Sequence, residues 1–114
     1  MNTSWRYPDR ETAGSFEGEG TGSGVSFFVV DMEPGRGPRL HRHPYSETFV
    51  LQAGRARFRV GDRTVEAEAG EVIVAPPETA HGFKSLGPEN LRMVTIHDSP
   101  KMQTEWLEPE QPAG

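Results

Sequence analysis

Residues 55–69 read RARFRVGDRTVEAEA, and this stretch decides the fold class. Polar and apolar side chains alternate on both sides of Gly61-Asp62, a dipeptide typical of the two-residue turn of a β-hairpin. One register sorts the side chains into apolar pairs on one face and opposite-charge pairs on the other, which predicts two antiparallel strands. The predicted pairs are Val60–Arg63 at the turn, Phe58–Val65 and Ala56–Ala67 on the apolar face, and Arg57–Glu66 and Arg55–Glu68 on the charged face.

Further short apolar runs, rich in β-branched and aromatic residues, lie on both sides of this hairpin. They span residues 25–32, 48–52, 72–75 and 91–97, and turns rich in Gly and Pro separate them. No convincing amphipathic helix longer than two turns is present in the sequence. The chain is therefore predicted to be all-β, an antiparallel sandwich or barrel.

Composition excludes several classes of protein. The chain has 114 residues, which is enough for one domain with its own core. It has no cysteine, which excludes disulfides, thiolate metal sites and a cysteine nucleophile. A net charge of −5 disfavours nucleic acid as a partner. Because no apolar run is long enough to span a membrane and no secretory signal is recognisable, we expect a cytoplasmic protein with no membrane partner.

The distribution of glycine and proline suggests three segments. We expect a flexible N-terminal arm over residues 1–24, a barrel over 25–98 and a C-terminal tail over 99–114. Trp5 and Tyr7 are large anchors in the arm, so part of it could pack on the body or on a partner subunit. Because exposed arms at both ends can extend a sheet across a two-fold axis, we predict a homodimer.

Two of the four histidines are His41 and His43, and a carboxylate follows at Glu47. Residues i and i+2 of a strand point to the same face, so these two imidazoles could share one cation. Glu47 could complete the set after a local bend, and His81 could close it from across a barrel. Such a set suits Fe, Mn, Ni, Zn or Cu better than Ca or Mg. The alternative is a surface His-x-His beside a proline turn.

Two spaced motifs resemble the two conserved motifs of the cupin family. They are Gly35-x5-His41-x-His43-x3-Glu47-x6-Gly54, which matches the first motif position for position, and Gly70-x5-Pro76-x-Glu78-x2-His81, which matches most of the second. The 15 residues between Gly54 and Gly70 are similar in number to those of small single-domain bacterial cupins. The resemblance covers about residues 25–97. Two positions depart from it: Glu78 replaces a glycine, so that the turn could differ, and Ser85 replaces an asparagine.

The resemblance implies a double-stranded β-helix, or jelly roll, that is usually dimeric. It also implies that His41, His43, Glu47 and His81 bind one divalent transition metal inside the barrel. Four protein ligands leave two positions of an octahedral metal for water, O2 or a bidentate substrate. Glu47 could instead leave the metal and act as a base. A barrel that has lost its metal is the alternative.

The last strand leaves the orientation of His97 open. Either Leu91, Met93, Thr95 and His97 or Arg92, Val94 and Ile96 face the barrel, and parity alone does not decide between the two sets. A His97 that lines a pocket could be a general acid or base, whereas an exposed His97 would bond to Asp98. The other candidates for a pocket wall are Phe49, Leu51, Phe58, Phe83 and Met93.

These features predict a metal-dependent enzyme that acts on a small organic molecule. We expect oxidoreductase chemistry of the dioxygenase type first, and isomerase or polyketide-cyclase-like chemistry second. The alternative is a non-catalytic module that binds or senses a small ligand, because this barrel hosts many functions.

Overall fold

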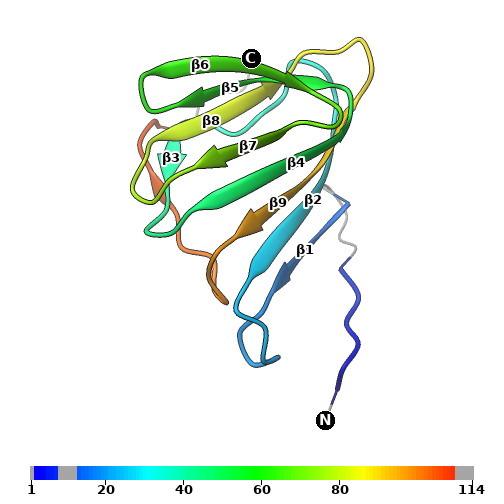
Figure 1. Cartoon of the computed structure of the whole chain (residues 1–114), viewed down its shortest axis with the longest axis vertical. Coiled ribbons are helices and arrows are strands. Elements are labelled where there is room, and N and C mark those ends of the chain that lie inside the picture. The colour runs from blue at the N-terminus through cyan, green and yellow to red at the C-terminus, as the bar shows by residue number, and fades with distance from the viewer. Residues whose placement is uncertain (1, 8–12, 110–114) are drawn as a thin grey trace.

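The computed structural model describes residues 2–7 and 13–109, and within them it contains strands and no helix (Figure 1). The predicted arm and tail therefore lie partly outside the described residues. The strands are β1 (Gly14–Glu17), β2 (Ser26–Met32), β3 (His41–Arg42), β4 (Glu47–Ala53), β5 (Arg55–Val60), β6 (Arg63–Glu68), β7 (Val72–Ala75), β8 (His81–Ser85), β9 (Leu91–His97) and β10 (Glu105–Trp106). Since no helix is found in this part of the chain, none there could cross a membrane.

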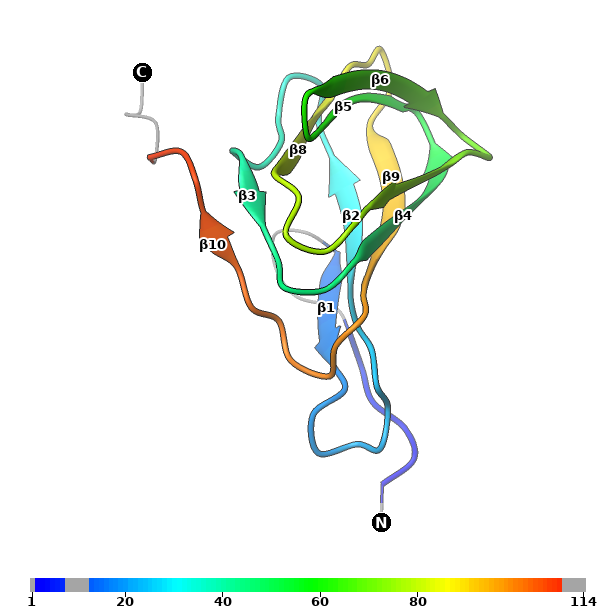
Figure 2. The same ribbon diagram turned by 60° about the vertical axis from the view of Figure 1, so that its left-hand side comes forward.

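The strands form two antiparallel sheets that face each other (Figure 2). One sheet has the order β1-β2-β9-β4-β7, and the other has the order β10-β3-β8-β5-β6. This arrangement is the double-stranded β-helix that the sequence predicted, so the fold class is confirmed.

The hairpin of β5 and β6 has the predicted register at every pair from Val60–Arg63 to Arg55–Glu68. Ala56 and Phe58 are fully buried on its apolar face. On the charged face, Glu66 lies 3.4 Å from Arg57 and 3.5 Å from Arg55. Because β6 is the edge strand of its sheet, the apolar face is not covered along its whole length, and Val65 is exposed.

The sheet begins earlier than the predicted barrel. Strand β1 lies within the predicted arm and pairs with β2, where Phe16 stacks on Phe27 with ring centroids 5.1 Å apart. The rings of Trp5 and Tyr7 pack edge-on against Phe16 and Phe27, respectively. Residues 1–24 are rich in glycine, so their composition did not predict this four-residue strand. Backbone pairing with β2 and the stacked ring of Phe16 hold the strand against the barrel.

Side chains that point into the barrel change character from one end to the other. On β9, Leu91, Met93, Thr95 and His97 point inward, which settles the parity of this strand. The apolar residues of the interior form one core cluster. Its buried members are Val30, Phe49, Leu51, Ala56, Phe58, Ala67, Ala75, Leu91 and Met93. The opposite end of the same interior holds the histidines.

Candidate metal centre

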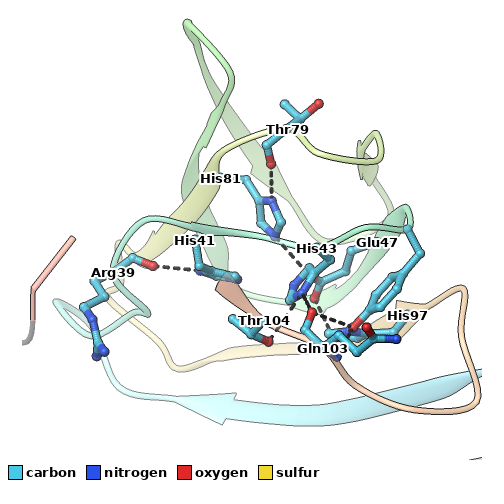
Figure 3. Close-up of polar contacts among 10 residues, drawn as sticks. Arg39, His41, His43, Glu47, Thr79, His81, His97, Gln103 and Thr104 are labelled. Atoms are coloured by element: carbon cyan, nitrogen blue, oxygen red, sulfur yellow. Dashed lines mark hydrogen bonds and ion pairs between the residues drawn. The ribbon is translucent and has the colours of Figure 1, made fainter. Parts of the chain in front are cut away.

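The two sheets bring the four predicted ligands together at one end of the barrel (Figure 3). His41 on β3 pairs across the sheet with His81 at the start of β8, and His43 follows β3 directly. Glu47 begins β4 in the facing sheet. One ligand atom from each of the four residues lies within 4.8 Å of the others, and all four side chains are buried. This cluster could hold a metal ion. The alternative of a surface His-x-His does not fit, because His41 and His43 are both buried.

Each of the three imidazoles of the cluster uses its Nδ1 atom on a backbone carbonyl. His41 Nδ1 donates to Arg39 O (2.7 Å), His43 Nδ1 to Gln103 O (2.7 Å), and His81 Nδ1 to Thr79 O (2.9 Å). Because a carbonyl oxygen only accepts hydrogen bonds, we assign the proton to Nδ1 in all three rings. A ring that carries only this proton keeps a lone pair on Nε2, which is the form of histidine that binds a metal.

The carboxylate of Glu47 faces these lone pairs. Its Oε1 atom lies 3.0 Å from Nε2 of His43 and 3.0 Å from Nε2 of His81. Two lone pairs and an anionic oxygen at this distance repel one another unless a proton or a metal cation lies between them. Imidazole nitrogens with one carboxylate oxygen are a donor set that suits a transition metal, so these residues fit such an ion.

The buried environment favours the metal-binding protonation states of Glu47 and His41. Burial raises the pKa of Glu47, but hydrogen bonds from the rings of His43, His81 and His97, when a proton rather than a metal lies between them and the carboxylate, outweigh it and hold this pKa well below its ordinary value. Burial also lowers the pKa of His41 to about 4, against the opposing effect of its bond to the Arg39 carbonyl. At neutral pH, Glu47 is therefore a carboxylate and His41 a neutral imidazole, as metal binding requires.

His97 lies beside the cluster and is 2% exposed, so the alternative of an exposed strand-end histidine is wrong. Its position on β9 pairs with Glu47 on β4, and inward parity carries the ring into the barrel. His97 Nε2 is 3.2 Å from Glu47 Oε2, outside hydrogen-bonding geometry, and Nδ1 is 2.7 Å from the hydroxyl of Tyr45. Unlike the other three rings, His97 faces at Nδ1 a group that can donate a proton.

A cavity of about 360 Å³ lies next to the cluster. Of the residues predicted for a pocket wall, Phe49, Phe83 and His97 line this cavity. Leu51, Phe58 and Met93 lie instead in the hydrophobic core, because their inward positions are further along the strands from the histidine end.

Some residues of the site were not singled out from the sequence. Gln103 contributes a carbonyl that orients His43, and Trp106 on β10 lies 4.9 Å from the ring of His41. Both come from the predicted tail, which β10 ties to β3. A backbone carbonyl leaves no side-chain signal in a sequence, so the role of Gln103 could not have been read from its residue type. The aromatic side chain of Trp106, in an otherwise polar segment, was a hint that the tail docks on the barrel.

The two departures from the cupin motifs keep the local backbone in place. Glu78 has φ = 60°, a left-handed conformation that favours glycine, and its N–H donates to His43 O at 2.8 Å. The turn therefore keeps the backbone conformation of a glycine without having one. Ser85 is buried, and its hydroxyl donates to Met32 O at 3.2 Å. It ties β8 to the end of β2 and lies in none of the contacts of the cluster.

Arg39 and Arg42, which lie on either side of His41 in the chain, both contact strand β10 or a residue on it. Arg42 Nε donates to Glu105 Oε2 at 2.8 Å, and this contact raises the pKa of Arg42 and lowers the pKa of Glu105. The guanidinium of Arg39 lies 4.2 Å above the ring of Trp106. Arg42 thus ties β3 to β10 on the outside of the site, and Arg39 packs on β10 through the ring of Trp106.

Comparisons with known proteins agree with this geometry. The family described as a cupin domain matches residues 28–97. A protein named polyketide synthase CurC, from Streptomyces cyaneus, is 35% identical over 82 residues, which are 71% of this chain and 52% of that protein. The chain thus spans about half the length of this curated relative.

Solved structures share the fold. An oxalate decarboxylase from Lactobacillus farciminis, in complex with formate, superposes with a TM-score of 0.73 at 26% identity over 82% of this chain and 30% of its own. A double-stranded β-helix protein from Klebsiella pneumoniae superposes with a TM-score of 0.72 over 96% of this chain and all of its own; at 19% identity it shows the fold alone. With a family match over more than half of its length, the chain belongs to the cupin family.

Proposed function

We propose that this protein is a metal-dependent enzyme that acts on a small organic molecule. The observation that carries the proposal is the convergence of imidazole Nε2 atoms on Glu47 Oε1, with each Nδ1 fixed by a backbone carbonyl. His41, His43, Glu47 and His81 would hold the ion. A divalent transition metal there would supply Lewis acidity, or electron exchange with O2 if it is iron or copper.

The residues of the chain have separate tasks in this proposal. The carbonyls of Arg39, Gln103 and Thr79 orient the three imidazoles. Glu47 Oε2 lies on the side of His97, away from the oxygen that contacts His43 and His81, and could accept a proton from a bound substrate. The apolar wall of the cavity contacts the organic part of the substrate.

Within this class we propose dioxygenase-like chemistry. Support comes from the donor set, which suits iron, and from the apolar cavity beside it, where an organic substrate and O2 could meet. The test is oxygen consumption by iron-loaded protein with catechol-like and diketone substrates, with His43→Ala as the inactive control. Oxygen uptake that persists in His43→Ala, or no uptake with any substrate of these classes, would contradict the proposal.

A second candidate is isomerase or polyketide-cyclase-like chemistry, which needs no O2. The relative named as a polyketide synthase, 35% identical over 82 residues, favours it. Product formation under anaerobic conditions distinguishes this candidate from the first. If no turnover occurs with any metal, a non-catalytic binding module remains, and a ligand would then raise the melting temperature even after metal removal.

The homodimer also stays a proposal. Val72 and Val74 support it, because both are exposed on the edge strand β7. An uncharged apolar patch can pack against the same patch of a second chain across a two-fold axis. Sedimentation should show a dimer at micromolar concentration, and Val74→Glu should weaken it. A monomer at that concentration would contradict the proposal. The cytoplasmic location likewise remains an expectation.

A further inference from the structure

The cavity beside the cluster is much larger than a metal and its two open positions require. Apart from the histidine cluster, its wall is mainly apolar. The apolar side chains are Phe28, Val30, Met32, Pro38, Phe49, Phe83 and Trp106. Except for Pro38, which precedes β3, these residues lie on strands of both sheets, so they surround a bound molecule rather than line a flat surface. A cavity of this kind fits an apolar molecule of the size of an aromatic ring system.

Among the described residues, two buried polar atoms on this wall have no hydrogen-bond partner: Nε2 of His97, which lies 3.2 Å from Glu47 Oε2, and the hydroxyl of Thr95. The hydroxyl of Thr95 is buried, with the residue 2% exposed, and has no hydrogen-bond partner among the described residues. Thr95 lies between Phe28 and Phe49 in the sheet and one inward position from His97. Buried hydroxyls are nearly always hydrogen-bonded, and one that is not is destabilising. A ligand with a polar group at this depth would satisfy it.

The outer part of the cavity adjoins a groove of different character. This groove has a volume of about 720 Å³ and shares Arg36, Phe83 and Trp106 with the apolar cavity. Its other charged residues are Arg39, Lys84 and Glu108, and Glu108 Oε1 already accepts the N–H of Leu40 at 2.8 Å. Basic side chains thus outnumber acidic ones here, in a chain of net charge −5. The entrance is therefore suited to an anion.

We propose that the cavity takes an aromatic acid whose ring body lies against the apolar wall, with an inner hydroxyl or carbonyl on Thr95 and an outer anionic group facing Arg36 and Lys84. This inference depends on the proposed function in one respect only, namely that the bound molecule would lie beside a metal ion. Thr95 and Arg36 act as specificity-determining residues. A small dicarboxylate such as oxalate lacks the ring body, so it would leave the apolar wall uncovered and Thr95 unpaired.

The test is a fluorescence titration of the full chain, after treatment with a chelator, with 6-hydroxy-2-naphthoate. Two analogues each lack one group: 2-naphthoate lacks the hydroxyl and 2-naphthol lacks the carboxylate. Thr95→Val should weaken binding of the hydroxynaphthoate about two- to tenfold, the range of one hydrogen bond, and leave 2-naphthoate unchanged. Thr95→Ser should keep the preference for the hydroxyl. Arg36→Gln should weaken both acids and leave 2-naphthol unchanged.

Three results would overturn the inference. The first is that the hydroxynaphthoate shows no saturable binding. The second is that Thr95→Val weakens binding of both acids equally, in a variant whose melting temperature equals that of the native protein. The third is that oxalate at equal concentration displaces the hydroxynaphthoate. Because the titration is done without metal, it is independent of the metal proposal. If the chain binds metal but not the probe, only the proposal of an aromatic-acid ligand is contradicted. If it binds the probe but takes up no metal, only the proposed metal-dependent function is contradicted.

Discussion

The two ends of the barrel interior are built by the same strands and differ in nearly every other respect. On β9 the inward side chains are Leu91 and Met93 at one end and Thr95 and His97 at the other. On β4 they run from Leu51 to Glu47. Strand alternation thus decides which residues face inward, and residue type decides whether that part of the interior serves stability or chemistry.

The two ends also differ in how well their groups are satisfied. Phe58, at the core end, is fully buried with its ring 5.0 Å from that of Phe49. At the histidine end, Glu47 Oε1 faces two imidazole nitrogens at 3.0 Å, and the hydroxyl of Thr95 has no hydrogen-bond partner in the described part of the chain. The core end is therefore complete without any addition, whereas the histidine end gains from a cation and a ligand.

The largest effect is expected at the core end. Replacing Phe58 with Ala removes a fully buried ring and leaves a cavity, so it should lower the free energy of unfolding by about 3–5 kcal/mol. Urea unfolding monitored by circular dichroism measures this. Metal stoichiometry of the molecules that remain folded should not change. A loss below about 1 kcal/mol would mean that this end of the barrel is not the close-packed core.

At the histidine end the effect should fall on metal affinity instead. Because His43 supplies one of the four donors, His43→Ala should weaken metal binding at least about a hundredfold and leave the fold of the metal-free chain intact. Isothermal titration calorimetry measures the affinity. The matched control is Arg42→Ala, because Arg42 lies between two ligands in the chain but contacts Glu105 outside the site. An equal loss in both variants would contradict the assignment.

Metal removal should destabilise the histidine end. A metal that binds only the folded chain stabilises it by about 2.7 kcal/mol at a free concentration of 100 times the Kd. A chelator should therefore lower the melting temperature of the native protein and leave that of His43→Ala unchanged. If the chelator shifts both proteins equally, the stabilisation does not come from this site.

The smallest effect concerns the turn before His81. Glu78 holds a left-handed conformation with φ = 60°, so Glu78→Gly should raise the free energy of unfolding by about 1 kcal/mol. Glu78→Ala keeps the Cβ atom and should bring no such gain. Differential scanning calorimetry of the two variants makes the comparison. Equal stability of the two would show that the backbone at this position is not strained.

The sequence predicted those features that depend on residue type and spacing. Alternation and the Gly61-Asp62 turn together gave the register of β5 and β6. Alternation puts Phe58 and Ala56 on the face opposite the arginines, and closing the turn between Val60 and Arg63 fixes which residues pair. The motif spacing predicted which four residues meet. It could not predict the tautomers of the histidines, since these depend on the carbonyls of Arg39, Thr79 and Gln103, which any residue carries.

The remaining differences arise from depth and from pairing. Parity places Leu51, Phe58 and Met93 inward but does not say how far each lies from the histidine end, so core and cavity wall were not separated. Strand β1 and the strand β10 that carries Trp106 are short and lie in polar or glycine-rich segments, where only pairing with β2 and β3 gives them structure.

The central claim is that three imidazoles and one carboxylate of this chain hold a single metal ion. Its most direct test is the metal content per chain of the full-length protein, purified without chelator and measured by inductively coupled plasma mass spectrometry, beside the His81→Ala variant. We predict one divalent transition metal ion per native chain and essentially none in the folded variant. A native chain that takes up no such metal from any of the five candidate ions, or a variant that retains it fully, would contradict the claim.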